Sequence, residues 1–281
     1  MTAERCTMVD YPRPDQLVDL FNNASPGMAV TDADGAVVLA NKAARELLGD
    51  QAATGAPLAA AVGVDDYARL FAEGDPVENL PASFTATGFP RGHANIGFGE
   101  VDGVRYGFWA LRPVTTHPTP APRPAAGEST AQEWIARVDQ PDPSYREVGE
   151  EAVPFLRAYY DHCPVAIHLI EQDGTVAHAN WKDIAIVGAT EQPDSYVGHH
   201  IRRIYADQDV VEDFLGRWGE DAPIIDFRAD FLNRAGERVP VVIFSTAKVE
   251  DAVLKNTRCF VFSDSDPSRP RDRVKALDLS F

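Results

Sequence analysis

The chain has 281 residues, of which 44 % are hydrophobic, and a formal net charge of −17 at pH 7. This length and apolar content allow about two domains with separate cores, and the negative charge argues against direct binding of nucleic-acid phosphates. No stretch reaches the roughly 18 apolar residues of a membrane span, and the N-terminus lacks the apolar core of a signal peptide. We therefore expect a cytoplasmic protein that does not contact a membrane.

The three cysteines, Cys6, Cys163 and Cys259, are odd in number and scattered along the chain. Such usage is typical of a reducing compartment and argues against a disulfide framework. No Cys or His pair has zinc-ligand spacing, so the sequence predicts no structural metal.

The first elements form an ordered series. A helix is predicted over residues 15–23 and a strand over residues 27–31, and Asp34 and Gly35 then turn the chain into a second strand that ends at Asn41. An amphipathic stretch follows and stops at Gly49, which is typical of a glycine at a helix C-terminus.

The rest of the first half gives weaker signals. Residues 52–64 are rich in Ala, Gly and Pro, and residues 84–99 show little strand pattern. Asp102 and Gly103 join a strand over 95–101 to a strand over 104–114. We expect the interior pocket of this half to be collapsed or absent.

Seven prolines interrupt residues 113–150, which predicts a semi-rigid connector. Inside it, Trp134, Ile135 and Val138 share one stripe of a short helix over residues 131–138. Four segments follow from these signals: a domain at 15–114, a Pro-rich linker at 115–151, a second domain at 152–266 and a basic tail at 267–281.

The second domain repeats the first. The Asp-Gly turn returns 139 positions later at Asp173 and Gly174, followed by Asn180 and Gly188. A repeat this long indicates a duplicated domain, since solenoid repeats span only about 20 to 50 residues. A helix over 152–162 and a strand over 165–170 come first, and strands over 226–231, 239–249 and 258–263 follow. The predicted fold is α+β: two domains, each a five-stranded antiparallel sheet with short helices on one face.

This order of elements resembles the PAS sensor domain family in about four fifths of the chain. The residues that carry the resemblance are Pro26, Asp34, Gly35, Asn41, Gly49, Pro164, Asp173, Gly174, Asn180, Gly188 and Gly198. Phe262, Ser263 and Asp264 resemble the family's exit toward an output module. Because PAS-like modules share a fold and not a ligand, the ligand has to be argued from side chains.

Haem is the less favoured cofactor. His199 and His200 open a stretch that looks like the helix walling a PAS pocket, and an imidazole there could ligate iron, although a solvated helix start explains them better. Cys163 and Pro164 match a haem-thiolate dipeptide, but the first half has Ser25 and Pro26 at the same place. The flavin photosensor type called LOV is excluded, because its reactive-cysteine segment is absent.

Flavin, FAD or FMN, is the cofactor to test first. Phe214 and Trp218 lie on one helical face, as in some FAD-binding PAS domains, although core packing explains them equally well. His168 and His178 replace the apolar Val30 and Leu39 of the first half and could point into one shared space, or each could bond to a nearby carbonyl or carboxylate. The expected cofactor-binding residues, from the second domain, are His168, His178, Trp181, His199, His200, Tyr205, Phe214, Trp218, Phe227 and Phe244.

Motifs of common enzymes are missing, so we expect a non-enzymatic sensor whose second domain binds a small ligand or redox cofactor. Without an output domain it would act through contacts: a homodimer through its amphipathic helices, or a protein partner such as a kinase or transcription regulator. One alternative is an interaction scaffold with filled cores. Another is an enzyme in which His168, His178, His199 and Glu171 act as acid and base.

Overall fold

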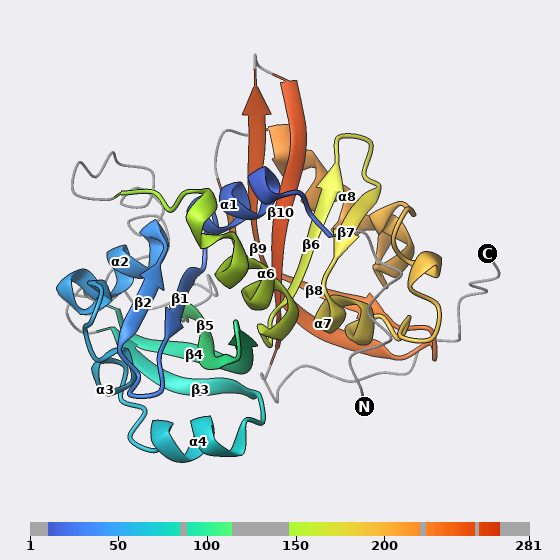
Figure 1. Ribbon diagram of the computed structural model, residues 1–281. Helices are drawn as coiled ribbons and strands as arrows, with labels where there is room; N and C mark the ends of the chain where they lie inside the picture. The colour runs from blue at the N-terminus through green and yellow to red at the C-terminus, as the bar shows by residue number, and fades with distance from the viewer. Residues whose placement is uncertain (1–10, 85–88, 114–145, 220–222, 251–252, 265–281) are drawn as a thin grey trace. The chain divides into compact units, whose positions relative to one another are not determined.

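The computed structural model describes residues 11–84, 89–113, 146–219, 223–250 and 253–264. The chain divides into two compact units, residues 14–164 and residues 165–281 with the first 13 residues. Each unit holds one five-stranded antiparallel sheet with short helices (Figure 1), so the predicted α+β fold with two PAS-like domains is confirmed. The predicted helix 131–138 and the tail 267–281 lie outside the described residues.

The first unit has the strand order β2-β1-β5-β4-β3. Its elements are α1 (Pro14–Asn22), β1 (Gly27–Thr31), β2 (Val37–Ala40), α2 (Lys42–Leu48), η2 (Gly49–Ala52), α3 (Leu58–Ala61), α4 (Tyr67–Glu73), β3 (Val77–Phe84), β4 (Phe89–Val101), β5 (Val104–Pro113), η4 (Glu150–Ala152) and α6 (Val153–His162).

The second unit has the matching order β7-β6-β10-β9-β8. Its elements are β6 (Ala166–Glu171), β7 (Val176–Ala179), α7 (Trp181–Ile186), η5 (Pro193–Ser195), η6 (Ile201–Ile204), α8 (Gln208–Gly216), η7 (Arg217–Gly219), β8 (Ile224–Leu232), β9 (Arg238–Glu250) and β10 (Val253–Ser263).

An asparagine in each unit, Asn41 or Asn180, links the first strand to the helix that follows the second strand by hydrogen bonds. Asn41 Oδ1 accepts from Met28 N and from Ala44 N, both at 2.8 Å. Asn180 Oδ1 accepts from Ile167 N at 2.9 Å and from Asp183 N at 3.0 Å. One side chain thus caps a helix and binds a buried strand, and because its amide nitrogen also donates to Pro26 O in the first unit and to Val165 O in the second, the position needs an amide.

The Asp-Gly turns form as predicted, with Gly35 at φ 77° and Gly174 at φ 87°, in the left-handed region that favours glycine. The strand register also locates the residue gained in the second copy. Ala29 pairs with Ala40, whereas His168 pairs with Ala179. His168 is therefore equivalent to Ala29, not to Val30 as the sequence alignment indicated, because the extra residue lies between Pro164 and the strand.

Strand structure in residues 77–101 is longer than the sequence suggested. We expected little strand over residues 84–99, but β3 ends at Phe84 and β4 begins at Phe89. Strand β4 pairs with β5 from Gly92 opposite Pro113 to Val101 opposite Val104. This continuous pairing compensates for the low strand propensity of a glycine-rich segment.

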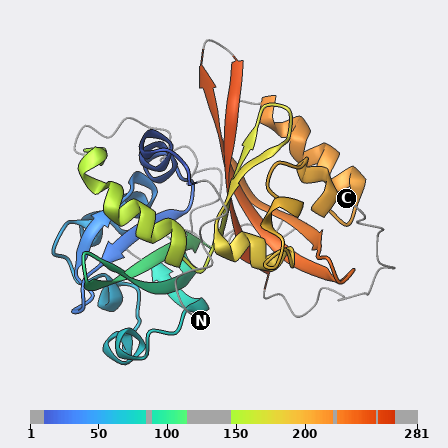
Figure 2. The ribbon, with the colours of Figure 1, turned by 45° about the vertical axis from the view of Figure 1, so that its right-hand side comes forward.

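Helix α6 packs in the first unit, on the face of the sheet opposite to α4 (Figure 2). Tyr159 donates from its hydroxyl to Trp109 O at 2.6 Å, and its ring meets Phe108 and Phe21 edge to face. The amphipathic pattern of residues 152–162 had placed this helix with the second domain. The domain boundaries at residues 114 and 152 stay a prediction. The contacts of α6 with the first unit favour a boundary after this helix.

Two glycines of β4 let α6 come this close. An ideal Cβ at Gly97 would lie 1.8 Å from His162 O, and one at Gly99 would lie 2.1 Å from the His162 ring. Any side chain at either position would therefore push the C-terminus of the helix away from the sheet.

None of the described helices is long and apolar enough to cross a membrane.

Candidate functional site

The candidate site lies in the second unit and begins with a buried ion pair. His168 is on the inner face of β6, the face against which α7 packs, and Asp183 is on α7; their side chains are 1 % and 0 % exposed. His168 Nδ1 and Asp183 Oδ1 are 3.1 Å apart. The side chain of Asn180 caps α7 by accepting from Asp183 N, which fixes the first turn of the helix and so points Asp183 at β6.

Tyr196 completes this buried network. Its hydroxyl donates to Asp183 Oδ2 at 2.7 Å and lies 3.4 Å from His168 Nδ1. Burial and the Asp183 carboxylate hold the pKa of Tyr196 well above its usual value of 10. The tyrosine therefore stays protonated and acts as a hydrogen-bond donor.

His168 carries the positive charge of the network. Burial alone would lower the pKa of its imidazole, but the Asp183 carboxylate outweighs burial, with a further contribution from Cys259, and the pKa rises to about 10. At neutral pH the pair is an imidazolium and a carboxylate in an apolar interior, an arrangement that is stable only while both partners remain.

Cys259 faces the pair from β10, directly opposite His168 in the strand register. Its Sγ lies 3.3 Å from Ser245 Oγ and 3.8 Å from Thr257 Oγ1. The site therefore draws on β6, α7 and β10, together with Tyr196. Within the described ranges no group of three or more His, Cys, Asp or Glu side chains is placed to hold a metal ion.

The expected aromatic residues fill the layer between sheet and helices. Tyr205 packs against Phe214 and Phe231 with ring centroids 6.0 Å and 5.1 Å apart, and Phe214 contacts Trp218 and Phe227. These side chains are buried in one core cluster that also contains Tyr196 and Cys259. The structure thus brings Tyr205, Phe214, Trp218 and Phe227 together, but as packed core.

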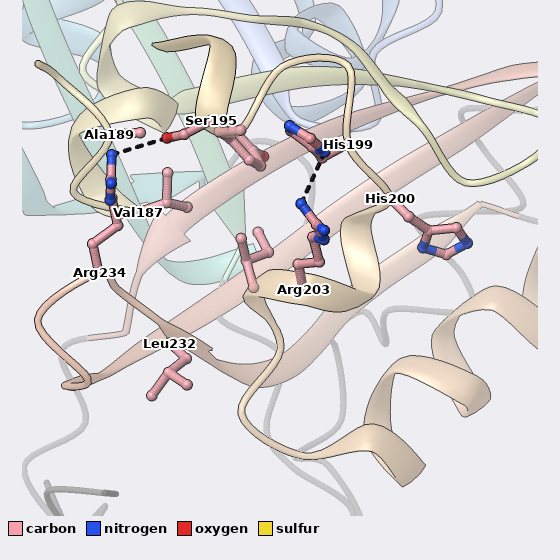
Figure 3. A pocket seen from close by; sticks show the side chains of 10 residues that line it. Val187, Ala189, Ser195, His199, His200, Arg203, Leu232 and Arg234 are labelled. Carbon is pink, nitrogen blue, oxygen red and sulfur yellow. Dashed lines mark hydrogen bonds between the residues drawn. The ribbon is translucent and has the colours of Figure 1, made fainter. Parts of the chain in front are cut away.

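A pocket opens to solvent beside this core (Figure 3). Its lining residues are Val187, Ala189, Ser195, Tyr196, His199, His200, Arg203, Ile204, Leu232 and Arg234. The cavity volume is about 20 Å³, enough for roughly one water molecule. Flavin and haem need pockets of at least about 300 Å³. This pocket, as its described side chains form it, is therefore too small for FAD, FMN or haem.

The two adjacent histidines line the pocket but differ in their contacts. His199 Nδ1 accepts from Arg203 at 2.9 Å. His200 caps η6 by accepting from Arg202 N at 3.1 Å, and burial and the Arg202 charge lower its pKa. Both imidazoles thus use a ring nitrogen to accept a hydrogen bond from the protein.

Three expected site residues lie elsewhere. Trp181 begins α7 and is 40 % exposed. Phe244 lies opposite Phe260 and contacts Phe262, on the sheet face away from the core cluster. His178 lies opposite Leu169 and not opposite His168.

The expectation that His168 and His178 point into one space is wrong. His168 pairs with Ala179, and neighbouring residues of a strand project to opposite faces, so His178 is on the outer face. Glu171 is exposed at the end of β6, and His199 is at the pocket. The His and Glu constellation considered for an enzyme is therefore not assembled.

Sequence reasoning missed Asp183, Tyr196 and the two pocket arginines. One signal was available for Asp183: it stands where the first copy has Ala44, on the helix face that the asparagine cap turns inward. A charged residue at an apolar repeat position indicates a buried polar partner. Tyr196 and Arg234 lie in loop segments whose sequence shows no repeat pattern, and they gave no such signal.

Comparison with known proteins gives one family match and several structural ones. Residues 16–82 match the family model described as a PAS domain. The PAS domain of an HTR-like protein from Haloarcula marismortui is 20 % identical, with 41 % of this chain and 93 % of that chain covered and a TM-score of 0.35. No curated protein matches.

Two further solved structures are similar. A domain of a sensory box sensor histidine kinase/response regulator from Geobacter sulfurreducens is 15 % identical, covers 38 % of this chain and 90 % of its own, and has a TM-score of 0.32. A LOV protein of Rhodobacter sphaeroides is 14 % identical, with 41 % of this chain and 68 % of that chain covered and a TM-score of 0.35.

Proposed function

We propose that this chain, in which residues 16–82 match the PAS domain family and a second PAS-like domain follows, is a non-enzymatic signal-transduction protein. The second domain senses a small ligand, and ligand binding changes a contact with a protein partner. The proposed partner is a second copy of the chain or a protein that supplies the output, such as a kinase or transcription regulator, and the proposed location is the cytoplasm.

Tyr196 is the observation that carries this proposal. Its side chain lines the solvent-open pocket, and its hydroxyl bonds Asp183, the partner of His168 on a central strand. A ligand that moves Tyr196 would change the environment of a buried charge pair. Because unpaired buried charges are costly, a small displacement at the pocket can alter the stability of β6.

The filled core supports a second candidate, the interaction scaffold. Tyr205, Phe214 and Phe231 leave the layer between sheet and helices closely packed. A scaffold would use the same fold without ligand response. The scaffold and the sensor differ in one property, namely whether a small molecule alters the second unit.

A ligand screen with the full chain separates the two. The melting temperature is measured with a panel of small molecules, and hydrogen exchange of β6 amides is followed with each molecule that shifts it. The sensor predicts a ligand that raises the melting temperature and changes the hydrogen-exchange rate of the β6 amides. No shift with any molecule, combined with retained partner binding, would favour the scaffold.

Tyr196→Phe tests the route of coupling. The variant should still bind the ligand but lose the β6 exchange response, because the bond to Asp183 is gone. Tyr67→Phe is the matched control, since it also removes a buried hydroxyl but from the first unit. An unchanged β6 response in Tyr196→Phe would contradict the route.

A further inference from the structure

One loop segment of the second unit, residues 190–197, lies between two glycines in the left-handed conformation. Gly188 has φ 72° and Gly198 has φ 84°, and both are exposed. Glycine adopts such angles without the steric cost that other residues meet, so both positions suit a hinge. The segment between them follows α7 and precedes η6.

The backbone hydrogen bonds of residues 190–197 are largely internal. Ser195 N donates to Gln192 O at 3.0 Å. Tyr196 N and Val197 N donate to Pro193 O at 2.9 and 3.0 Å. Within this fully described segment only Tyr196 is buried. The segment can therefore move as one body without losing these bonds.

Two side chains attach the segment to the rest of the unit by hydrogen bonds. From the segment, the Tyr196 hydroxyl donates to Asp183 Oδ2 at 2.7 Å. From the turn between β8 and β9, Arg234 donates to Ser195 Oγ at 3.0 Å and to Gln192 Oε1 at 3.1 Å (Figure 3). Tyr196 thus fixes the segment to the core, and Arg234 fixes it to the edge of the sheet.

The pocket lies along the seam between this segment and the rest of the unit. Ser195 and Tyr196 line it from the segment, and the opposite wall comes from η6, β8 and the following turn through Ile204, Leu232 and Arg234. Movement of the segment away from this wall would withdraw the Tyr196 ring and open a path to the buried ion pair.

We propose that residues 190–197 form a lid over the buried His168–Asp183 pair, and that Arg234 is the latch that keeps the lid closed. In the closed state the Tyr196 hydroxyl bonds Asp183. In the open state Tyr196 leaves Asp183, and the pair gains access to water.

The lid would also regulate the pocket, and this part of the inference rests on the proposed sensing function. A ligand in the pocket contacts the lid and the opposite wall at once, so it binds the closed state more tightly than the open state. A ligand shifts an equilibrium by its differential affinity for the two states. Ligand binding should therefore keep the lid closed.

The thiol of Cys259 can report on lid opening. It is 0 % exposed, lies opposite His168 in the strand register and belongs to the same buried cluster as Tyr196. A small thiol reagent, methyl methanethiosulfonate, reaches it only after the interior opens. Cys163, which is buried in the first unit, is an internal control. Peptide mass spectrometry of the labelled full chain measures both rates.

The variant Arg234→Gln should label at Cys259 about ten-fold faster or more, because the latch bonds are lost, while Cys163 keeps its rate. Arg217→Gln is the matched control, because Arg217 is an exposed arginine of the same unit that pairs with Asp213 and does not line the pocket. It should leave both rates unchanged. An unchanged Cys259 rate in Arg234→Gln would overturn the latch.

Gly198→Ala tests the hinge. A Cβ at Gly198 meets no atom within 4 Å, so the substitution acts through the backbone alone. Alanine disfavours the left-handed φ that the closed lid requires, and Cys259 labelling should become several-fold faster. Gly216→Ala is the control, since a Cβ there also meets nothing within 4 Å and Gly216 lies in a helix. Equal rates in the two variants would overturn the hinge.

Urea separates lid opening from unfolding of the whole unit. Lid movement exposes little surface, so Cys259 labelling should hardly change at low urea, whereas labelling through unfolding accelerates steeply. A steep rise from the lowest urea concentrations would overturn the lid.

Ligands from the screen connect the lid with the proposed function. A molecule that raises the melting temperature should also slow the labelling of Cys259. If the variants and urea give the expected results but no molecule slows the labelling, the sensing function fails and the lid stands.

Discussion

The two units fill the same position of the same sheet with different chemistry. In the first unit Ala29 lies opposite Trp109, and in the second the equivalent pair is His168 opposite Cys259. Trp109 donates to Thr31 Oγ1 at 2.7 Å and stacks on Tyr67 with ring centroids 5.4 Å apart. The first interior is thus closed by neutral aromatic contacts, whereas the second contains an ion pair.

The outer faces of the two sheets also differ, in the size of the side chains on the fourth strand. Gly97 and Gly99 of β4 make room for α6, but the equivalent positions on β9, which the pairing identifies as Thr246 and Lys248, carry side chains. The first sheet is therefore covered on both faces by helices of its own unit. The two interiors should therefore respond differently to substitution, because only the second depends on a buried charged pair.

Loss of the buried carboxylate should have the largest effect. Asp183→Ala installs the residue that the first copy has at Ala44, and should destabilise the second unit by about 3 to 5 kcal/mol, because His168 loses its partner. The double variant His168→Ala/Asp183→Ala should lose less. Urea unfolding with hydrogen exchange of β6 and β10 measures both. An Asp183→Ala loss below about 1 kcal/mol would mean that the pair contributes little.

Alkaline pH should weaken the second unit next most strongly. The pKa of His168 is raised from 6.5 to about 10 in the folded state. Its stabilisation is therefore fully present below pH 6.5 and is lost as the pH rises toward 10, by an amount on the order of a few kcal/mol. Urea midpoints across this range should fall in the natural protein and remain flatter in His168→Ala/Asp183→Ala. Parallel curves would contradict the charge assignment.

Crowding the α6 contact should affect the first unit more moderately. Gly97→Ala places a Cβ against His162 O and should cost about 1 to 3 kcal/mol. Gly216→Ala is the matched control, since a Cβ there meets nothing within 4 Å and alanine favours the helix. Thermal unfolding compares the two. Equal stability of both variants would show that α6 does not need the glycines.

The smallest effect is expected in the first interior. Tyr67→Phe removes a hydroxyl that bonds Thr31 Oγ1 at 2.8 Å and Asp32 O at 3.0 Å, and should cost about 1 kcal/mol. The melting temperature should fall slightly without any new pH dependence between 6.5 and 10. A loss as large as that of Asp183→Ala would remove the distinction between the two interiors.

The sequence predicted the elements whose causes are local. Single residues determine these elements: Gly35 and Gly174 allow the positive φ of the Asp-Gly turns, and the side chains of Asn41 and Asn180 cap the helices that follow. Strand β4 was underestimated because its structure depends on pairing along β5 and not on its own propensity. Comparison of the two repeats thus predicted the fold from the turn and cap residues that both share.

The candidate site was only partly predictable. Placing Phe214 and Trp218 on one helix face was sound, since their rings are 5.6 Å apart. The alignment placed His168 opposite Val30, one position away from its structural equivalent Ala29. The inserted residue lies in the short segment before the strand, where it does not change the hydrophobic pattern of the sequence. The sequence also could not predict on which sheet α6 packs. An apolar stripe indicates that one face of a helix is buried, but it does not identify the sheet that buries it.

The placement of α6 decides where this polypeptide can be divided. A fragment starting at residue 152 would carry α6 without the sheet on which it packs, so that Phe155 and Tyr159 lose their aromatic contacts with that sheet. The remaining fragment would lose the helix that covers Phe108. A cut after Pro164 leaves the hydrophobic layer under α6 closed. The sequence repeat begins before this helix, whereas the first compact unit ends after it, at Pro164.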